Sequence, residues 1–277
     1  MERTLNIRGC RYFVTTQGNG RPLLLLHGFT GSSQNWQAIT PALSSRYRVA
    51  AVDLLGHGRT DSPPDPARYQ MAEAASDLIA ILDELGAAQV DLLGYSMGGR
   101  LALYTTVHHP RRINRLILES ASPGLKTEQE RRERRQRDNA LADRIEREGI
   151  EAFVNFWEGL PLWDSQKGLA AAARQNLRKQ RLQNNPVGLA NSLRGMGTGI
   201  QPSLWEQLGN LKMPVHLIAG ALDDKFAEIN RQMVRQIPTA RLEIAPDAGH
   251  TVHLERPLLF QGKVLEFLAK PCPQLAK

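Results

Sequence analysis

Residues 90–100, V-D-L-L-G-Y-S-M-G-G-R, decide how this chain of 277 residues folds. An apolar run that is typical of a buried strand leads into G-Y-S-M-G, which fits the G-x-S-x-G pattern of a nucleophile elbow, and residues 100–107 continue at helical spacing. The neighbours of the serine must be small, because a Cβ at Gly94 or Gly98 would strike the facing strand or helix. The Ser96 hydroxyl then stands exposed at a helix N-terminus, where backbone N–H groups favour negative charge. The alternative is an ordinary strand-to-helix turn, and residues elsewhere must decide between the two.

Strand and helix patterns alternate on both sides of the elbow. Residues 5–16 predict a short hairpin that turns near Gly9. Such alternation implies right-handed crossovers and a mostly parallel sheet flanked by helices. Besides the elbow strand, strands are expected at residues 22–26, 48–53, 115–119, 215–219 and 240–245, and helices at residues 36–43, 71–85, 100–107 and 257–268.

The alternation of strand and helix patterns ends after residue 122, where charged helical segments begin. We expect an inserted helical cap at residues 123–208 and a core domain made of residues 1–122 and 209–277. The arginine-rich run at residues 126–137 is typical of a solvated face. On a helix, however, Arg134 shares its face with Leu141 and Ile145, whereas Arg132 and Arg135 lie far around the cylinder. We therefore expect Arg134 alone of these three arginines to point towards the core.

Composition and charge limit the classes of function. The hydrophobic fraction of 42% is ordinary, the longest aliphatic run near the N-terminus is too short to span a bilayer, and no signal-peptide core is apparent, so we expect a cytoplasmic protein without a membrane partner. The net charge of +7 would be compatible with binding to nucleic acid. Zinc spacing, aromatic RNA-binding motifs and basic tails are absent from the sequence, and much of the excess charge lies at residues 126–181. We therefore expect an anionic small molecule as partner, no nucleic acid, and a monomer or weak oligomer.

The turn H-G-F-T-G at residues 27–31 follows the strand at residues 22–26. An elbow serine needs an oxyanion donor from such a loop, so the N–H groups of Phe29 and Met97 are the expected oxyanion hole. His27 should order this loop. His57, in a second turn-rich loop, should likewise order its loop without doing chemistry.

Two further residues follow strand ends in an order that suits catalysis. An acid comes after the strand near residue 220 and a histidine after the strand near residue 245, and sites form at this edge of open parallel sheets. His250 would accept the Ser96 proton, and Asp223 would hold the imidazole in the right tautomer. Asp223 is preferred because it comes first after the turn, and the adjacent Asp224 is the alternative.

Five motifs across residues 22–268 resemble the α/β-hydrolase superfamily: H-G-F, G-H-G-R, G-Y-S-M-G-G, G-A-L-D and A-G-H. This resemblance implies the α/β-hydrolase fold, a mostly parallel eight-stranded sheet flanked by helices with an inserted helical cap. More closely, G-Y-S-M-G-G-R, the cap arginines and D-D-K-F resemble the 2-succinyl-6-hydroxy-2,4-cyclohexadiene-1-carboxylate synthases of menaquinone biosynthesis. Those enzymes are lyases that eliminate pyruvate from 2-succinyl-5-enolpyruvyl-6-hydroxy-3-cyclohexene-1-carboxylate.

The closer resemblance implies a set of site residues. It places the triad on Ser96, Asp223 and His250 and the oxyanion turn on Phe29 and Met97. Its substrate-facing residues fall on Tyr95, Arg100, Arg134, Trp157 and Arg178. The cap positions stay open, because Arg178 has cationic neighbours and Trp163 competes with Trp157.

The residue chemistry favours a polycarboxylate substrate, because an arginine fork binds a carboxylate through two charge-assisted hydrogen bonds. No cofactor is expected, and no metal, since His250, His253 and Glu255 do not match the H-E-x-x-H pattern. Two rival hypotheses remain. One is an esterase or carbon–carbon bond hydrolase that acts on a neutral or monoanionic substrate. The other is a non-catalytic small-molecule receptor on the same fold.

Overall fold

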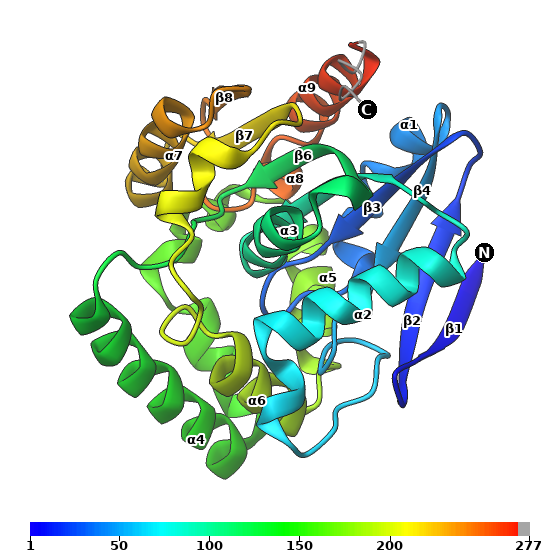
Figure 1. The fold of residues 1–277 in the computed structure, drawn as a ribbon. Coiled ribbons are helices and arrows are strands. Elements are labelled where there is room, and N and C mark those ends of the chain that lie inside the picture. Colours follow the sequence, from blue (N-terminus) through cyan, green and yellow to red (C-terminus); the bar gives the residue numbers. More distant parts are fainter. Residues whose placement is uncertain (271–277) are drawn as a thin grey trace.

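The central strands are apolar along most of their length, because helices cover both faces of the sheet. In the computed structural model, which describes residues 1–270, eight strands form one sheet in the order β1-β2-β4-β3-β5-β6-β7-β8 (Figure 1). The pairs β1–β2 and β2–β4 are antiparallel, and all the others are parallel. The bounds are β1 Glu2–Ile7, β2 Cys10–Gln17, β3 Arg21–Leu26, β4 Tyr47–Val52, β5 Val90–Tyr95, β6 Ile113–Glu119, β7 Val215–Gly220 and β8 Ala240–Ala245. The predicted fold class is confirmed.

Helices enclose the sheet from two sides. α2, α3 and α7 contribute apolar residues to a core on one face, and α1 and α9 contribute to a separate core on the other. The bounds are α1 Thr40–Ser44, α2 Met71–Glu84, α3 Met97–His108, α7 Asp224–Gln236, α8 Val252–Glu255 and α9 Pro257–Ala269, with 3-10 turns η1 Ser33–Trp36, η2 Pro66–Tyr69 and η3 Pro110–Arg112. No helix within residues 1–270 has both the length and the apolar composition that a membrane crossing requires.

The continuous helix expected at residues 36–43 is wrong. The turn η1 ends at Trp36, and α1 begins only at Thr40. A capping box between Ser32 and Asn35 defines the 3-10 turn. Pro41 then favours the first turn of a new helix, because it has no N–H to donate within a helix interior.

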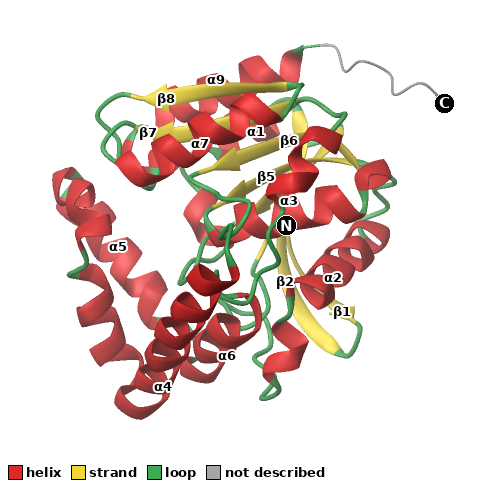
Figure 2. Cartoon of the chain, turned by 60° about the vertical axis from the view of Figure 1, so that its left-hand side comes forward, coloured by secondary structure: helices red, strands yellow, loops and turns green. Residues whose placement is uncertain are grey.

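The chain between β6 and β7 forms the helical cap. Its elements are α4 Glu128–Glu158, η4 Pro161–Gly168, α5 Ala171–Leu182 and α6 Pro186–Met196, followed by η5 Trp205–Asn210. Figure 2 shows α4, α5 and α6 together at one end of the sheet domain. α4 and α6 share a small core of their own. The expected end of the cap at residue 208 falls inside η5, where Leu204, Trp205 and Leu208 pack in the main core, so the chain has returned to the core by then.

The long cap helix α4 contains a break at Gly149. This residue has φ 80° and ψ 176°, a conformation that residues with a Cβ rarely adopt. No neighbouring atom lies within 4 Å of the position where a Cβ would sit, so backbone conformation rather than crowding requires the glycine. The sequence predicted a helix after Lys126 that includes Leu141 and Ile145, and the structure extends it through this break to residue 158.

Polar contacts anchor the cap to the loops of the core. The Asn184 side chain accepts a hydrogen bond from the Gly58 N–H (3.0 Å) and donates one to the Thr30 carbonyl (2.9 Å). Gly56 and Gly188 approach so closely that a Cβ on either one would strike the other's carbonyl oxygen. The cap is therefore fixed against the loops that follow β3 and β4.

Candidate active site

The elbow holds Ser96 in a strained conformation between β5 and α3. Its φ is 49° and its ψ is −108°, outside the usual regions for a residue with a side chain. The turn is as tight as predicted: a Cβ on Gly94 would meet the Gly98 carbonyl, and one on Gly98 would meet the His27 carbonyl, both at 2.4 Å. The Ser96 N–H donates to the Glu119 carbonyl at 2.8 Å, which secures the turn to β6.

Ser96, His250 and Asp223 meet at the carboxyl edge of the sheet. The His250 Nε2 lies 3.0 Å from the Ser96 Oγ, and its Nδ1 lies 2.6 Å from the Asp223 Oδ2. The imidazole and the Asp223 carboxylate are both buried. Asp223 also caps α7 by accepting from the Phe226 N–H, whereas Asp224 is exposed on the first turn of α7. The predicted contacts are therefore present with Asp223 as the acid.

The Phe29 and Met97 N–H groups lie in the predicted oxyanion turn. Within residues 1–270 neither group donates a hydrogen bond, so both can donate to an oxyanion. His27 orders this turn: its Nε2 accepts from the Leu54 N–H (2.9 Å), and its carbonyl accepts from the Gly98 N–H (3.1 Å). The expected scaffold role of His27 therefore has a structural basis in these two bonds.

We expect the free energy of unfolding to fall as the pH drops from about 6.5 to about 4, because His27 is buried in its neutral form. Burial lowers its pKa to about 4, and the Leu54 N–H occupies the lone pair that a proton would take. The unfolded chain then binds protons first, so stability rises with pH across this window. At roughly 1.36 kcal/mol per pKa unit, His27 alone accounts for on the order of 3 kcal/mol.

Urea unfolding at pH 7, 5.5 and 4.5 measures this effect. A His27→Gln variant should start less stable at pH 7, because it loses the Leu54 contact, but its stability should depend less steeply on pH. An unchanged slope in that variant would contradict the assignment. The buried His57, whose pKa burial lowers to about 3, should contribute a further part of the slope in both proteins.

A cavity of about 380 Å³ opens over the triad between core and cap. It contains every predicted site residue except two: Asp223 lies behind His250, and Arg178 lies elsewhere. Its lining includes the predicted residues Phe29, Tyr95, Ser96, Met97, Arg100, Arg134, Trp157 and His250, and also Asp138, Trp163 and Lys225. A cavity with three cations and one carboxylate in its wall is suited to an anionic ligand.

Arg100 is a buried cation that forms no ion pair with a carboxylate within residues 1–270. Its side chain comes from the first turn of α3, and its Nη1 donates to the Met196 carbonyl and to the Gln201 Oε1, both at 2.8 Å. Burial, and then the positive charge of Arg134, lower its pKa to about 10. A buried charge that has only neutral acceptors is costly to maintain. An anion in the cavity would supply the missing counter-charge.

Arg134 occupies the predicted inner face of α4. It lines the cavity together with Leu141, and Ile145 farther along the helix is fully buried. Its Nε donates to the Asp138 Oδ1 at 2.7 Å, an i,i+4 contact that the sequence reasoning missed. Asp138 also accepts from the Gly199 N–H (3.2 Å), so this acid orients Arg134.

Arg134→Ala should lower kcat/KM for an anionic substrate by about ten- to a hundredfold, because a charge-assisted hydrogen bond contributes roughly 1.5–3 kcal/mol. Arg132→Ala and Arg135→Ala are matched controls on the same helix, and both side chains are exposed. Steady-state kinetics of the three variants should show less than about a threefold effect in the controls. Equal effects in all three variants would show that Arg134 has no specific role and that the arginine run is only a solvent-exposed face of the helix.

Arg178 is a correction to the predicted site. It lies on α5, where its Nη1 donates to the Glu158 Oε2 and its Nη2 to the Asn155 Oδ1, both at 2.6 Å. It lines a separate cavity on the cap and not the cavity over Ser96. The buried α5 arginine is Arg181, which lies over the Trp163 ring. Spacing within α5 could not reveal this difference, because the contacts that bury Arg181 come from residues outside α5.

Aromatic rings form the apolar wall of the triad cavity. The Trp157 ring packs against Phe29, at 5.4 Å between ring centroids, and against Trp163, at 5.6 Å. Trp163 itself lies 5.7 Å from the His250 ring, so both candidate tryptophans line the site. Tyr95 is buried beside His250 at 5.5 Å, and burial raises its pKa well above the usual value.

The possible metal ligands near His250 have other partners. His253 pairs with the buried Glu119 at 2.8 Å, and Glu255 accepts from the Gly249 N–H and the Thr251 hydroxyl. Within residues 1–270 no cluster of three or more histidine, cysteine or acidic residues could hold a metal ion. The prediction of a metal-free site rests on the sequence pattern alone.

A serine on a strained elbow, a buried histidine–aspartate pair and an open oxyanion turn define a hydrolase-type site on an α/β sheet. A family model described as the alpha/beta hydrolase fold matches residues 21–257, so the chain belongs to the α/β-hydrolase family. Within it, a Bacillus subtilis protein provisionally named 2-succinyl-6-hydroxy-2,4-cyclohexadiene-1-carboxylate synthase is 49% identical over 96% of this chain and 98% of that protein. The resemblance that the motifs indicated is thereby confirmed.

Two further comparisons agree. The synthase of the same name from Serratia proteamaculans is 32% identical over 93% of this chain and 98% of its own length. The solved structure of MenH from S. aureus superposes with a TM-score of 0.88 at 38% identity, covering 93% of this chain and 97% of that one. The similarity thus extends over core and cap together.

Proposed function

We propose that this protein is a lyase of menaquinone biosynthesis. It eliminates pyruvate from 2-succinyl-5-enolpyruvyl-6-hydroxy-3-cyclohexene-1-carboxylate and yields 2-succinyl-6-hydroxy-2,4-cyclohexadiene-1-carboxylate. The identity of 49% to the Bacillus relative over nearly the full length of both chains supports the reaction. The observation in the site that carries it is the buried Arg100, a cation without an acid partner in the same cavity as Ser96 and His250.

The substrate matches this cavity in charge. It carries three carboxylates, one each on the ring, the succinyl arm and the enolpyruvyl group. Arg100 from the core and Arg134 from the cap lie in the wall of one cavity, where each can donate to a carboxylate. The aromatic wall of Phe29, Trp157 and Trp163 would pack against the six-membered ring.

The chemistry uses the triad as a relay for one proton. His250 takes the Ser96 proton at Nε2, and the Ser96 oxygen removes a proton from the substrate ring. The proton comes from ring carbon C2, and the electron pair of that C–H bond forms the C2–C3 double bond. The electron pair of the existing C3–C4 double bond moves to C4–C5, and the C5–O bond to the enolpyruvyl group breaks. The N–H groups of Phe29 and Met97 would stabilise the negative charge that develops. The leaving group takes up a proton and becomes pyruvate, so no acyl-enzyme forms.

The test is to supply purified protein with the enolpyruvyl substrate and to follow pyruvate with a coupled dehydrogenase. Fast release of pyruvate, together with weak cleavage of p-nitrophenyl acetate, is the expected result. Efficient ester cleavage without pyruvate would favour the esterase rival, and ligand binding with neither reaction would favour the receptor. The cytoplasmic location and the monomeric or weakly oligomeric state stay predictions.

A further inference from the structure

Lys225 is a cation of the triad cavity to which neither the sequence pattern nor the mechanism above gives a role. It stands on the first turn of α7, two residues after the triad acid Asp223, and it lines the cavity that contains Ser96. Within residues 1–270 its ammonium group has no hydrogen bond and no ion pair. By contrast, Arg134 is bonded to Asp138, the single carboxylate in the cavity wall.

Lys225 lies close to the catalytic base His250, because the neighbouring residue Phe226 contacts both side chains. The adjacent Phe226 ring lies 4.6 Å from the His250 ring, and the Lys225 Nζ lies 5.7 Å from the centre of that same phenyl ring. Phe226 therefore contacts both the ammonium group and the imidazole, and all three residues line the same cavity. Lys225 is exposed to solvent, so an entering anion can reach it without displacing protein atoms.

The cations of this cavity repel one another when it is empty. Partial burial, and then the charge of Arg134, lower the pKa of Lys225. Burial, and then the same Arg134, lower the pKa of Arg100. Asp138 cannot neutralise all three cations, since it is already bonded to Arg134 and to the Gly199 N–H. The mutual repulsion of the three cations would be reduced by an anion bound between them, so the cavity favours anionic ligands.

We propose that Lys225 binds a carboxylate of the substrate, as the third member of a cation set with Arg100 and Arg134. The inference rests on the proposed function and adds a specificity residue to it. The three members come from α3, α4 and α7, so a tricarboxylate is contacted from the core, from the cap and from the helix of the triad acid. A lysine is a compact point charge on a flexible stem, which suits one carboxylate oxygen rather than a fixed bidentate pair.

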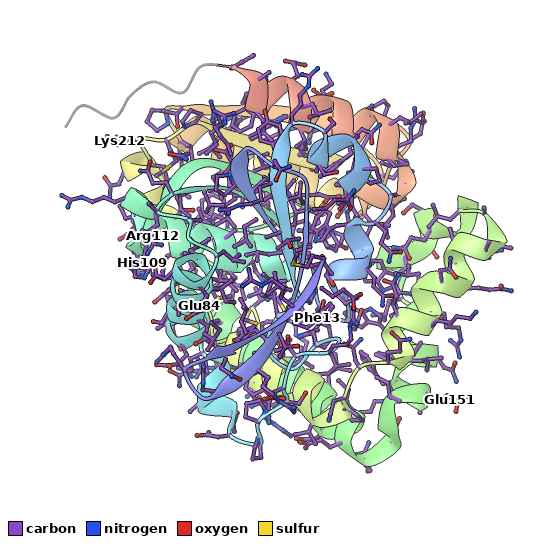
Figure 3. The ribbon with its side chains drawn as sticks, turned by 90° about the vertical axis from the view of Figure 1, so that its right-hand side faces the viewer. Phe13, Glu84, His109, Arg112, Glu151 and Lys212 are labelled. Carbon is purple, nitrogen blue, oxygen red and sulfur yellow. The ribbon has the colours of Figure 1, made fainter. Side chains whose placement is uncertain are left out.

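Lys225→Gln tests the proposal, with Lys225→Arg to restore the charge. Lys212→Gln is the matched control, because Lys212 is also exposed, does not line the cavity and precedes β7, far from the cap residue Glu151 (Figure 3). We expect Lys225→Gln to raise KM for the enolpyruvyl substrate about five- to twentyfold with kcat within threefold, a modest effect because solvent screens an exposed charge. Lys225→Arg should stay within threefold of wild type, and Lys212→Gln should be unchanged.

A thermal melt separates binding from a structural role. Lys225→Gln removes a repulsive charge, so its melting temperature should be equal to or above that of the wild type although it binds substrate more weakly. A lower melting temperature in Lys225→Gln, or KM values alike in Lys225→Gln and Lys212→Gln, would overturn the proposal.

A binding measurement keeps this inference separate from the proposed reaction. Propane-1,2,3-tricarboxylate binding, measured by titration calorimetry, should be about five- to twentyfold weaker in Lys225→Gln than in the wild type. If the wild type releases no pyruvate but this difference remains, the proposed reaction is wrong and the anion site stands. If the wild type releases pyruvate and the difference is absent, the reaction stands and the role of Lys225 is wrong.

Discussion

Replacing Ser96 with alanine is expected to lower kcat for pyruvate release by about a thousandfold or more while the fold stays intact. Without the hydroxyl, no group stands 3.0 Å from the His250 Nε2 to carry the proton between imidazole and substrate. The variant should be nearly as stable as the wild type, because alanine keeps the strain at φ 49° and loses only one partly buried hydrogen bond. Coupled detection of pyruvate and circular dichroism measure the two quantities.

The remaining triad members give the comparison that defines the mechanism. His250→Ala should be as inactive as Ser96→Ala, and the double variant should be little worse than either one, because the two groups act as a unit. Asp223→Asn should also be severely impaired, whereas Asp224→Asn should stay within about threefold, since its side chain is exposed. Activity of Ser96→Ala within tenfold of wild type would remove the triad from the reaction.

Arg100→Met is expected to lower kcat/KM by about a hundredfold, the second-largest effect in this protein. Methionine keeps an unbranched apolar stem but removes the buried cation, and hydrogen bonds to charged groups contribute roughly 1.5–3 kcal/mol each. The change also leaves the Met196 carbonyl and the Gln201 Oε1 without their donor, so the melting temperature should fall slightly. Steady-state kinetics and thermal unfolding together separate these two effects.

Arg100→Lys sharpens this test, because lysine keeps the charge and loses the planar fork. We expect it to recover part of the activity, to about tenfold below wild type. Arg235→Met is the matched control for charge, since Arg235 is exposed on α7 outside the cavity. If Arg100→Met turned over substrate like Arg235→Met, carboxylate binding by Arg100 could not be part of the mechanism.

The sequence was sufficient wherever a local pattern determines the structure. The elbow at residues 94–98 requires two glycines for reasons of contact, and the order of Ser96, Asp223 and His250 follows from strands that end at one edge of the sheet. The orientation of the Arg134 side chain towards the cavity could be predicted from helical spacing alone. In each of these places the chain neighbours of a residue fix its position.

The prediction failed where the packing of separate elements decides. Arg178 and Arg181 lie three residues apart on α5, and both line a cavity other than the triad cavity, although Arg181 is buried and Arg178 is half-exposed. Lys225 was part of the motif D-D-K-F, yet its place in the cavity depends on how α7 meets the cap. A long-range contact of this kind leaves no periodic signal in the sequence.

The break at Gly149 gives the cap helix two arms that are rigid separately. The arm before it carries Arg134 and the arm after it carries Trp157, and both residues line the triad cavity. The backbone conformation at Gly149, where a Cβ would have open space around it, therefore helps to set the spacing between the charged and the aromatic residue in the cavity wall. A different backbone conformation at Gly149 would therefore change the width of the cavity while every residue in its wall stayed the same.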